Sequence, residues 1–176
     1  SDIAPMSEVL AAGLVMLSGW ERHQPLVDFM CGSGTILIEA ALIAADIPPG
    51  CFRKSYAFQN WPDYDEELYE TITSAALGRI RDNDGYIYGC DRIERVIEKA
   101  KNNITAANVD DMIKVKTCDF RDLKPPEGRG VVIINPPYGE RLMVSELARL
   151  YESTGDHLKV NYQGYTAWII SSWAMA

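Results

Sequence analysis

The sequence predicts an α/β fold built on a mainly parallel sheet with helices on both faces. Short apolar or β-branched runs of strand length alternate along the chain with longer amphipathic stretches. Each short run ends in a polar or glycine-containing turn. Such alternation implies right-handed crossovers between parallel strands, with the intervening helices packed on the sheet.

The first part of the chain predicts a leading helix and one strand–turn–helix unit. Residues 7–19, within a leading segment 1–22, carry apolar side chains at helical spacing. Residues 26–30 (LVDFM) have the character of a buried strand that stops at a glycine turn. The stretch 35–45 (TILIEAALIAA) is apolar almost all round, which predicts a helix enclosed between other layers.

An insert follows, because residues 46–84 are longer than a simple connection. Its first half is rich in turn residues and aromatics. Its second half predicts a helix with acidic residues in the first turn and with Arg79 and Arg81 in the last, an arrangement that suits the helix dipole. The buried stripe of that helix is expected to consist of Leu68, Ile72, Ala76 and Ile80.

The remaining elements alternate in the same way. A strand over 86–90 leads into a helix over 92–107, whose apolar residues recur on one face, and Asn108 suits a left-handed C-terminal cap. The later strands are expected at 113–117, 131–134 and 166–171, and a further helix at 145–159.

Composition limits the classes of protein that this chain can belong to. With 176 residues, of which 47% are hydrophobic and 24% charged, it is expected to form one globular domain over 1–176 rather than a disordered or collagen-like chain. No membrane-spanning helix and no secretory signal are expected. The four cysteines form no C-x-x-C pair and lie far from the two histidines, so we expect no metal site and a cytoplasmic location.

Chemistry is expected at the carboxyl ends of the strands, where ligands bind in open parallel sheets. Four distinctive segments lie there: DFMCGSGT (28–35), CDR (90–92), CDFRD (118–122) and NPPYGER (135–141). Gly32 and Gly34 permit a tight turn and close approach of a ligand, although a plain strand-to-helix turn explains them equally. Asp91 can accept from the hydroxyls of a ribose, but Asp91 and Glu94 also fit a helix capping box.

The last two segments, 118–122 and 135–141, carry side chains that can bind a nucleobase. Asp119 can accept from an adenine amino group with Phe120 packed on the ring, while an ordinary turn aspartate remains the alternative. The Asn135 side-chain oxygen and the Pro136 carbonyl can hold the N–H groups of an exocyclic amine, and Tyr138 can stack on a flipped base. Positioning and electrostatics then supply the rate, without a covalent nucleophile.

These segments, in this order, resemble the class I S-adenosylmethionine-dependent methyltransferases of the N-P-P-Y type. More narrowly, the chain resembles the THUMP-associated RNA methylases, especially the bacterial large-subunit rRNA guanine-N2 methyltransferases. The likeness extends to the leading APMSE, to LSGW (17–20), to FQNW in the insert and to NPPYGERL (135–142). It implies a Rossmann-like methyltransferase fold whose terminal hairpin strands are missing here, and a THUMP domain that is absent from this chain.

The resemblance also implies roles for individual residues. The target amine would lie at Asn135, Pro136, Pro137 and Tyr138. S-adenosylmethionine would be bound by Pro5, Ser7, Glu8, Asp28, Cys31, Gly32, Ser33, Gly34, Thr35, Asp91, Asp119 and Phe120. Two departures stand out: the family usually has Pro where this chain has Phe29, and often Lys where it has Ser7. Glu140 and Arg141 fit the extended motif, with a structural ion pair as the default explanation.

The expected reaction is therefore methyl transfer to an exocyclic amine of an RNA base, with guanine N2 of large-subunit rRNA as the expected target. An adenine-N6 methylase acting on DNA or RNA is the alternative, because both bases present an amine beside a ring nitrogen. A nicotinamide-dependent oxidoreductase and a non-catalytic RNA-binding or assembly module are the rivals of other classes. The formal net charge of -8 predicts that this segment alone binds RNA weakly.

Overall fold

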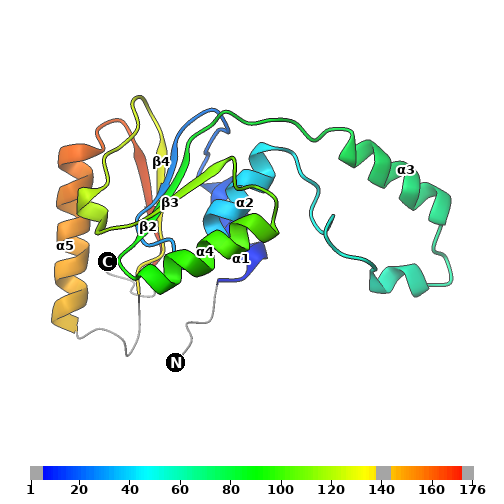
Figure 1. Ribbon diagram of the computed structural model, residues 1–176, viewed down its shortest axis with the longest axis horizontal. Coiled ribbons are helices and arrows are strands. Elements are labelled where there is room, and N and C mark those ends of the chain that lie inside the picture. Colours follow the sequence, from blue (N-terminus) through cyan, green and yellow to red (C-terminus); the bar gives the residue numbers. More distant parts are fainter. Residues whose placement is uncertain (1–5, 138–143, 172–176) are drawn as a thin grey trace.

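The computed structural model describes residues 6–137 and 144–171, which form a five-stranded parallel sheet with helices around it (Figure 1). The strands are β1 (Leu26–Asp28), β2 (Ile87–Asp91), β3 (Ile113–Thr117), β4 (Val131–Ile134) and β5 (Thr166–Ile169). Their order across the sheet is β3-β2-β1-β4-β5, and every neighbouring pair is parallel. The predicted sheet is confirmed, and two of the predicted strands, 113–117 and 131–134, have the predicted bounds.

Helices cover both faces of the sheet, as the sequence predicts. The helices α1 (Glu8–Leu17), α2 (Thr35–Ala44) and α4 (Glu94–Ala106) lie on one side, and α5 (Val144–Asn161) lies on the other (Figure 1). Neighbouring residues of one strand point to opposite faces, so Leu26 joins the core under α1, α2 and α4. Val27 joins the second core, which includes Tyr162 just after α5.

The ends of the helices are determined by local chemistry. Ser7 caps α1, because its hydroxyl oxygen accepts from the Leu10 N–H at 3.3 Å. The predicted left-handed residue after α4 is confirmed, since Asn108 has a φ of 52°. A short 3₁₀ helix, η2 (Phe120–Asp122), follows β3 and packs on the same side as α5.

The predicted packing of the insert is wrong, although its helix is present. The helix α3 (Glu66–Leu77) begins after Asp65, whose carboxylate accepts from the Leu68 N–H at 2.9 Å. No side chain from 46 to 86 is buried, and Leu68 is 55% exposed. The helix ends before Arg79 and Arg81, so neither arginine lies in its last turn.

The reason is visible in the path of the chain. The insert leaves the body after α2 and returns before β2, and two long arms hold α3 away from the sheet (Figure 1). An amphipathic pattern shows that a helix has an apolar face, but it does not show whether anything within the same chain covers that face.

Candidate active site

The sheet order predicts a ligand-binding crevice between β1 and β4, at the carboxyl ends of the strands. On one side of β1 lie β2 and then β3, and on its other side lie β4 and then β5. The strand order therefore reverses between β1 and β4, which is where open parallel sheets bind ligands at their carboxyl ends. Asp28 ends β1, Asp91 ends β2 and Asn135 follows β4, so three of the predicted site residues come from three adjacent strands.

The glycine turn after β1 has the geometry that its sequence predicts. Gly32 has a φ of 54° and Gly34 a φ of 86°, both in the region that favours glycine. The Gly34 N–H donates to the Cys31 carbonyl at 2.9 Å, which closes the turn just before α2 begins at Thr35. Across the turn, the Asn103 side chain donates to the Ser33 carbonyl at 3.0 Å, and the Ser33 and Thr35 hydroxyls lie 3.3 Å apart.

The first backbone N–H groups of α2, which follow this turn, are suited to bind an acceptor group of a ligand. A Cβ on Gly34 would lie 3.4 Å from the Cβ of Ala100, so α4 packs closely against the turn. Gly34 is the N-cap of α2 and has no side chain with which to accept from the first-turn amides. Amides of this kind, at a positive helix end, can receive a carboxylate or another anionic group of a ligand.

The buried carboxyl at the end of β1 has a strongly raised pKa. Asp28 is 1% exposed, and its pKa is raised to about 7, mainly because burial disfavours its charged form. Its Oδ1 accepts from the Met30 N–H at 3.0 Å, which lowers the pKa, while the nearby Asp91 raises it. Burial, with the nearby Asp28 and Asp91, raises the pKa of the Cys31 thiol. Cys31 is therefore neutral near pH 7 and unsuited to act as a nucleophile.

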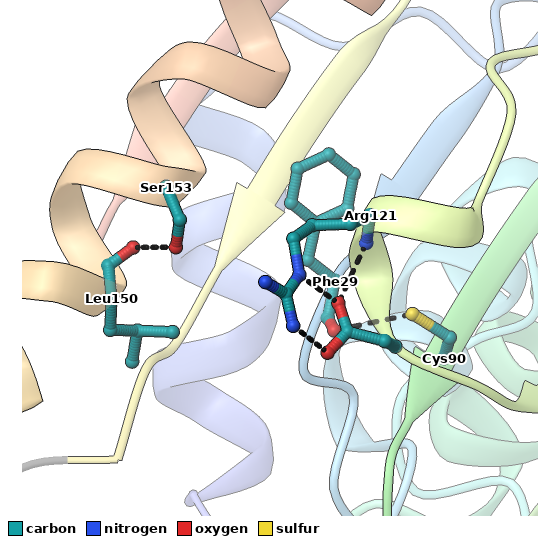
Figure 2. Close-up of polar contacts among 6 residues, drawn as sticks. Phe29, Cys90, Arg121, Leu150 and Ser153 are labelled. Carbon is teal, nitrogen blue, oxygen red and sulfur yellow. Dashed lines mark hydrogen bonds and ion pairs between the residues drawn. The ribbon is translucent and has the colours of Figure 1, made fainter.

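The second strand presents its acid at the expected place. Asp91 is half-buried, and its Oδ1 accepts from the Ile93 N–H at 3.0 Å. The N-cap of α4 is Ile93, and the helix begins at Glu94, so Asp91 does not occupy the cap position that the alternative interpretation requires. The Cys90 thiol beside it donates to the Phe29 carbonyl at 3.3 Å, which joins the ends of β1 and β2 (Figure 2).

The acid after β3 is held by a residue that the sequence argument missed. Asp119 accepts from Arg121 through both carboxylate oxygens at 2.8 Å, and this pairing lowers its pKa to about 2 (Figure 2). Phe120 is only 5% exposed and stacks on Phe29, with ring centroids 5.4 Å apart. The D-x-R spacing of 119–121 is the signal that could have predicted the pair. These contacts favour a core role for the Phe120 ring and leave its stacking on adenine a prediction.

The Asn-Pro-Pro segment lies directly after β4. Pro136 is buried, and Asn135 and Pro137 are half-buried. The Ile170 N–H donates to the Ile134 carbonyl at 2.9 Å, so β5 stays paired with β4 up to the start of this segment. Tyr138, and with it Glu140 and Arg141, lies outside the described residues.

The leading residues lie at the start of α1, beside α2 (Figure 1). Ser7 and Glu8 are exposed. The pKa of Glu39 in α2 is raised mainly by burial and in addition by the charge of Glu8, so these two acids are close. Pro5 lies outside the described residues.

The described residues contain neither a metal-binding cluster nor a membrane-spanning helix. Within 6–137 and 144–171, no three His, Cys, Asp or Glu side chains are grouped so that they could hold a metal ion. No helix in the same residues has the length and apolar character needed to cross a membrane.

A parallel sheet of this order, with a glycine turn after β1 and an Asn-Pro-Pro segment after β4, defines a Rossmann-like methyltransferase. The comparisons agree. The chain is 45% identical to the ribosomal RNA large subunit methyltransferase K/L of Aliivibrio salmonicida, over 96% of this chain and 25% of that protein. The sequence model of the RMKL-like methyltransferase domain family matches residues 1–175 of this chain. The chain therefore belongs to that family.

Two solved structures show the same fold. SMU.472, complexed with SAH, is 36% identical and superposes with a TM-score of 0.87 over 96% of this chain and 45% of that one. A Listeria monocytogenes protein, described as a predicted N6-adenine-specific DNA methylase, is 33% identical. It superposes with a TM-score of 0.88 over 99% of this chain and 46% of that chain. The chain thus spans less than half the length of these relatives.

Proposed function

We propose that this chain is the catalytic domain of an enzyme that transfers a methyl group from S-adenosylmethionine to an exocyclic amine of an RNA base, with guanine N2 of large-subunit rRNA as the preferred target. The observation that carries the proposal is the adjacency of β2, β1 and β4. It supports the proposal because Asp91, the glycine turn after Asp28 and Asn135 follow the carboxyl ends of three adjacent strands, where the ribose, the rest of the cofactor and the target amine are proposed to bind.

The residues around the glycine turn fit the cofactor. The prediction of S-adenosylmethionine is confirmed at the level of the family, since the chain matches a methyltransferase domain and its relative SMU.472 was solved with SAH. In this proposal the uncapped amides at the start of α2 receive the carboxylate of the cofactor. Asp91 accepts from the ribose hydroxyls, and the adenine lies near Asp119. When bound, the cofactor supplies an electrophilic methyl group.

The chain itself holds and orients the acceptor. An exocyclic amine on a base is a weak nucleophile, because its lone pair is delocalised into the ring. Acceptance of its N–H groups by the Asn135 side-chain oxygen and the Pro136 carbonyl favours a more tetrahedral nitrogen, whose lone pair is available. Two consecutive prolines cannot donate to a strand ladder, so they end β4 and direct this segment out of the sheet. The buried Pro136 holds that carbonyl in a constrained position.

The preference for RNA rests on the relatives. The 45% identical Aliivibrio protein is named a ribosomal RNA methyltransferase. The adenine-N6 alternative is supported by the description of the Listeria protein, at 33% identity. Both targets need the same two acceptors, so Asn135 and Pro136 serve either base.

Calorimetric titration with SAH tests the cofactor half of the proposal. Asp91→Ala removes one partner of a hydrogen-bonded ribose, and we expect SAH affinity to fall by about 5- to 150-fold, which corresponds to about 1–3 kcal/mol. Glu94→Ala is the matched control, because Glu94 lies in the first turn of α4 and would contribute only through the capping alternative. Equal losses in both variants, or binding of NAD in place of SAH, would contradict the proposal.

Methyl transfer tests the second half. We expect transfer to unmodified large-subunit rRNA and loss of that transfer in Asn135→Ala, with SAH affinity unchanged. Transfer to adenine in duplex DNA instead would identify the alternative. Retention of full transfer by Asn135→Ala would refute the assigned role of this side chain.

A further inference from the structure

The insert carries an exposed aromatic and basic segment, residues 51–61, which we call the aromatic limb. No acidic residue occurs between Asp46 and Asp63, whereas Arg53 and Lys54 lie within that interval. The limb is therefore locally cationic on a chain whose formal net charge is -8. In the part of the chain that the structure describes, neither cation has a carboxylate at ion-pair distance.

The limb has a defined shape. The Arg53 N–H donates to the Gly50 carbonyl at 2.8 Å, and Gly50 has a φ of 77°. The Tyr56 hydroxyl lies over Gly50, where a Cβ would overlap it. The Tyr56 N–H donates to the Gln59 side chain at 2.7 Å at the start of η1 (Ala57–Asn60). These contacts fix the turn and bring the Arg53 guanidinium to 5.9 Å from the Tyr56 ring centroid.

Aromatic rings continue from that cation in a connected series. Tyr56 stacks on Phe58 with centroids 5.2 Å apart, and Phe58 meets Trp61 edge-on at 6.4 Å. Trp61 is 64% exposed and Phe52 is 54% exposed. Both side chains therefore leave about half or more of their surface open to solvent, and a cluster of exposed aromatic rings is typical of a contact surface.

Beside Trp61 lies an open apolar hollow of about 260 Å³. Phe58, Tyr64, Tyr69, Leu68 and Ile72 form its other walls, and Asp63 and Asp65 also line it. A flat ring can enter such a space and stack on Trp61, whereas a phosphate would be repelled by the two carboxylates. The cations and the hollow therefore suit different parts of one ligand.

We propose that the aromatic limb is a contact surface for single-stranded RNA, with phosphates at Arg53 and Lys54 and a base stacked on Trp61. This inference rests on the proposed function, because it assumes an RNA substrate. Cations beside exposed aromatic rings are the combination that holds single strands without reading their sequence. With two cations in the limb, the expected affinity is low, in agreement with the weak binding that the net charge predicts.

The position of the limb suits an auxiliary contact rather than the reacting base. The insert is an arm that leaves the body after α2, and η1 lies within this arm, away from the sheet (Figure 1). The arm is separate from the crevice between β1 and β4. It would therefore hold a flanking part of the strand while the target base occupies the crevice.

Fluorescence anisotropy with the whole 176-residue chain tests this surface. The probes are a short labelled single-stranded RNA and the same strand annealed to its complement, each over a series of salt concentrations. We expect Trp61→Leu to weaken binding of the single strand by roughly 5- to 100-fold. In Arg53→Gln/Lys54→Gln, the slope of log K against log salt should become shallower by about 1.4, or about 0.7 for each lost phosphate contact.

Matched variants control for general effects. Trp168→Leu removes another exposed tryptophan, and Lys99→Gln/Lys101→Gln removes two exposed cations from α4. Neither should change RNA binding as the limb variants do, and all variants should keep the SAH affinity of the parent chain.

Three results would overturn the inference. The first is limb variants that bind the single strand with parent affinity, and the second is equal losses in the matched controls. The third is a change in self-association on sedimentation without a change in RNA binding, which would assign the limb to a second copy of the chain. If SAH binding or methyl transfer fails while RNA binding still depends on the limb, the proposed function fails and the limb stands as an RNA contact.

Discussion

Asp28→Asn is the most informative perturbation of the site, because Asp28 is an ionisable group at the carboxyl end of β1 and is 1% exposed. Burial raises its pKa from 3.8 to about 7. When the pKa of a carboxyl group is higher in the folded chain than in the unfolded chain, the group stabilises the folded state at pH values below its pKa in the unfolded chain. This stabilisation is lost as the pH rises through the pKa of the group in the folded chain. Asparagine does not titrate, and it keeps an oxygen that can accept from the Met30 N–H.

The magnitude follows from the size of the shift. A shift from 3.8 to about 7 corresponds to about 4 kcal/mol of unfolding free energy, all of it lost by the wild type between these two pH values. Between pH 5 and pH 8 the wild type crosses only the upper part of this range. We therefore expect the stability of Asp28→Asn relative to the wild type to increase by about 3 kcal/mol from pH 5 to pH 8.

Urea unfolding of the ligand-free chain at the two pH values measures this difference. Any constant cost of the asparagine cancels, because only the change with pH is compared. Asp119→Asn is the matched control: its carboxyl has a pKa lowered to about 2, so its stabilising effect is lost only in more acidic solution. Its difference from the wild type should not change between pH 5 and pH 8. A pH-independent difference for Asp28→Asn would refute the reasoning.

Two further substitutions test how the turn and the core support the site. Gly89→Ala would place a Cβ 2.5 Å from Leu37 Cδ1 and 2.9 Å from Cys31 Cβ, so we expect a loss of about 1–3 kcal/mol in urea unfolding and weaker SAH binding in calorimetry. Unchanged values of both would contradict the tight packing of α2 on β2. Phe29→Ala removes a ring that stacks on Phe120 and meets Tyr162 at 5.0 Å, and we expect a loss of about 3–5 kcal/mol in unfolding free energy. A loss below about 1 kcal/mol would show that this aromatic cluster does not hold the strand ends together.

Much of the fold could be predicted because its signals are local. The runs 113–117 and 131–134 are β-branched and end in polar turns, and both strands have the predicted bounds. Asn108 adopts the left-handed conformation that its position after a helix indicates. Two prolines after Ile134 must end a central strand, so the location of the Asn-Pro-Pro segment was also predictable.

The candidate site was predictable in part, through one rule about parallel sheets. Once the strands are known, their carboxyl ends are the expected ligand edge, and Asp28, Asp91 and Asn135 lie at the carboxyl ends of three adjacent strands. The pairing of Asp119 with Arg121 was missed, because the sequence argument assigned Asp119 to a ligand and did not consider the arginine two residues later as its partner.

The sequence by itself determined which segments become strands and helices, and where glycine, proline and acidic residues interrupt them. These properties depend on backbone conformation and on contacts within a few residues. Only the tertiary structure decided that β1 lies between β2 and β4, and so that the Asp28 carboxyl is removed from water and titrates near pH 7. It also decided that α3 stands away from the sheet with Leu68 exposed. Burial depends on which distant segments surround a side chain, and no local pattern of residues contains that information.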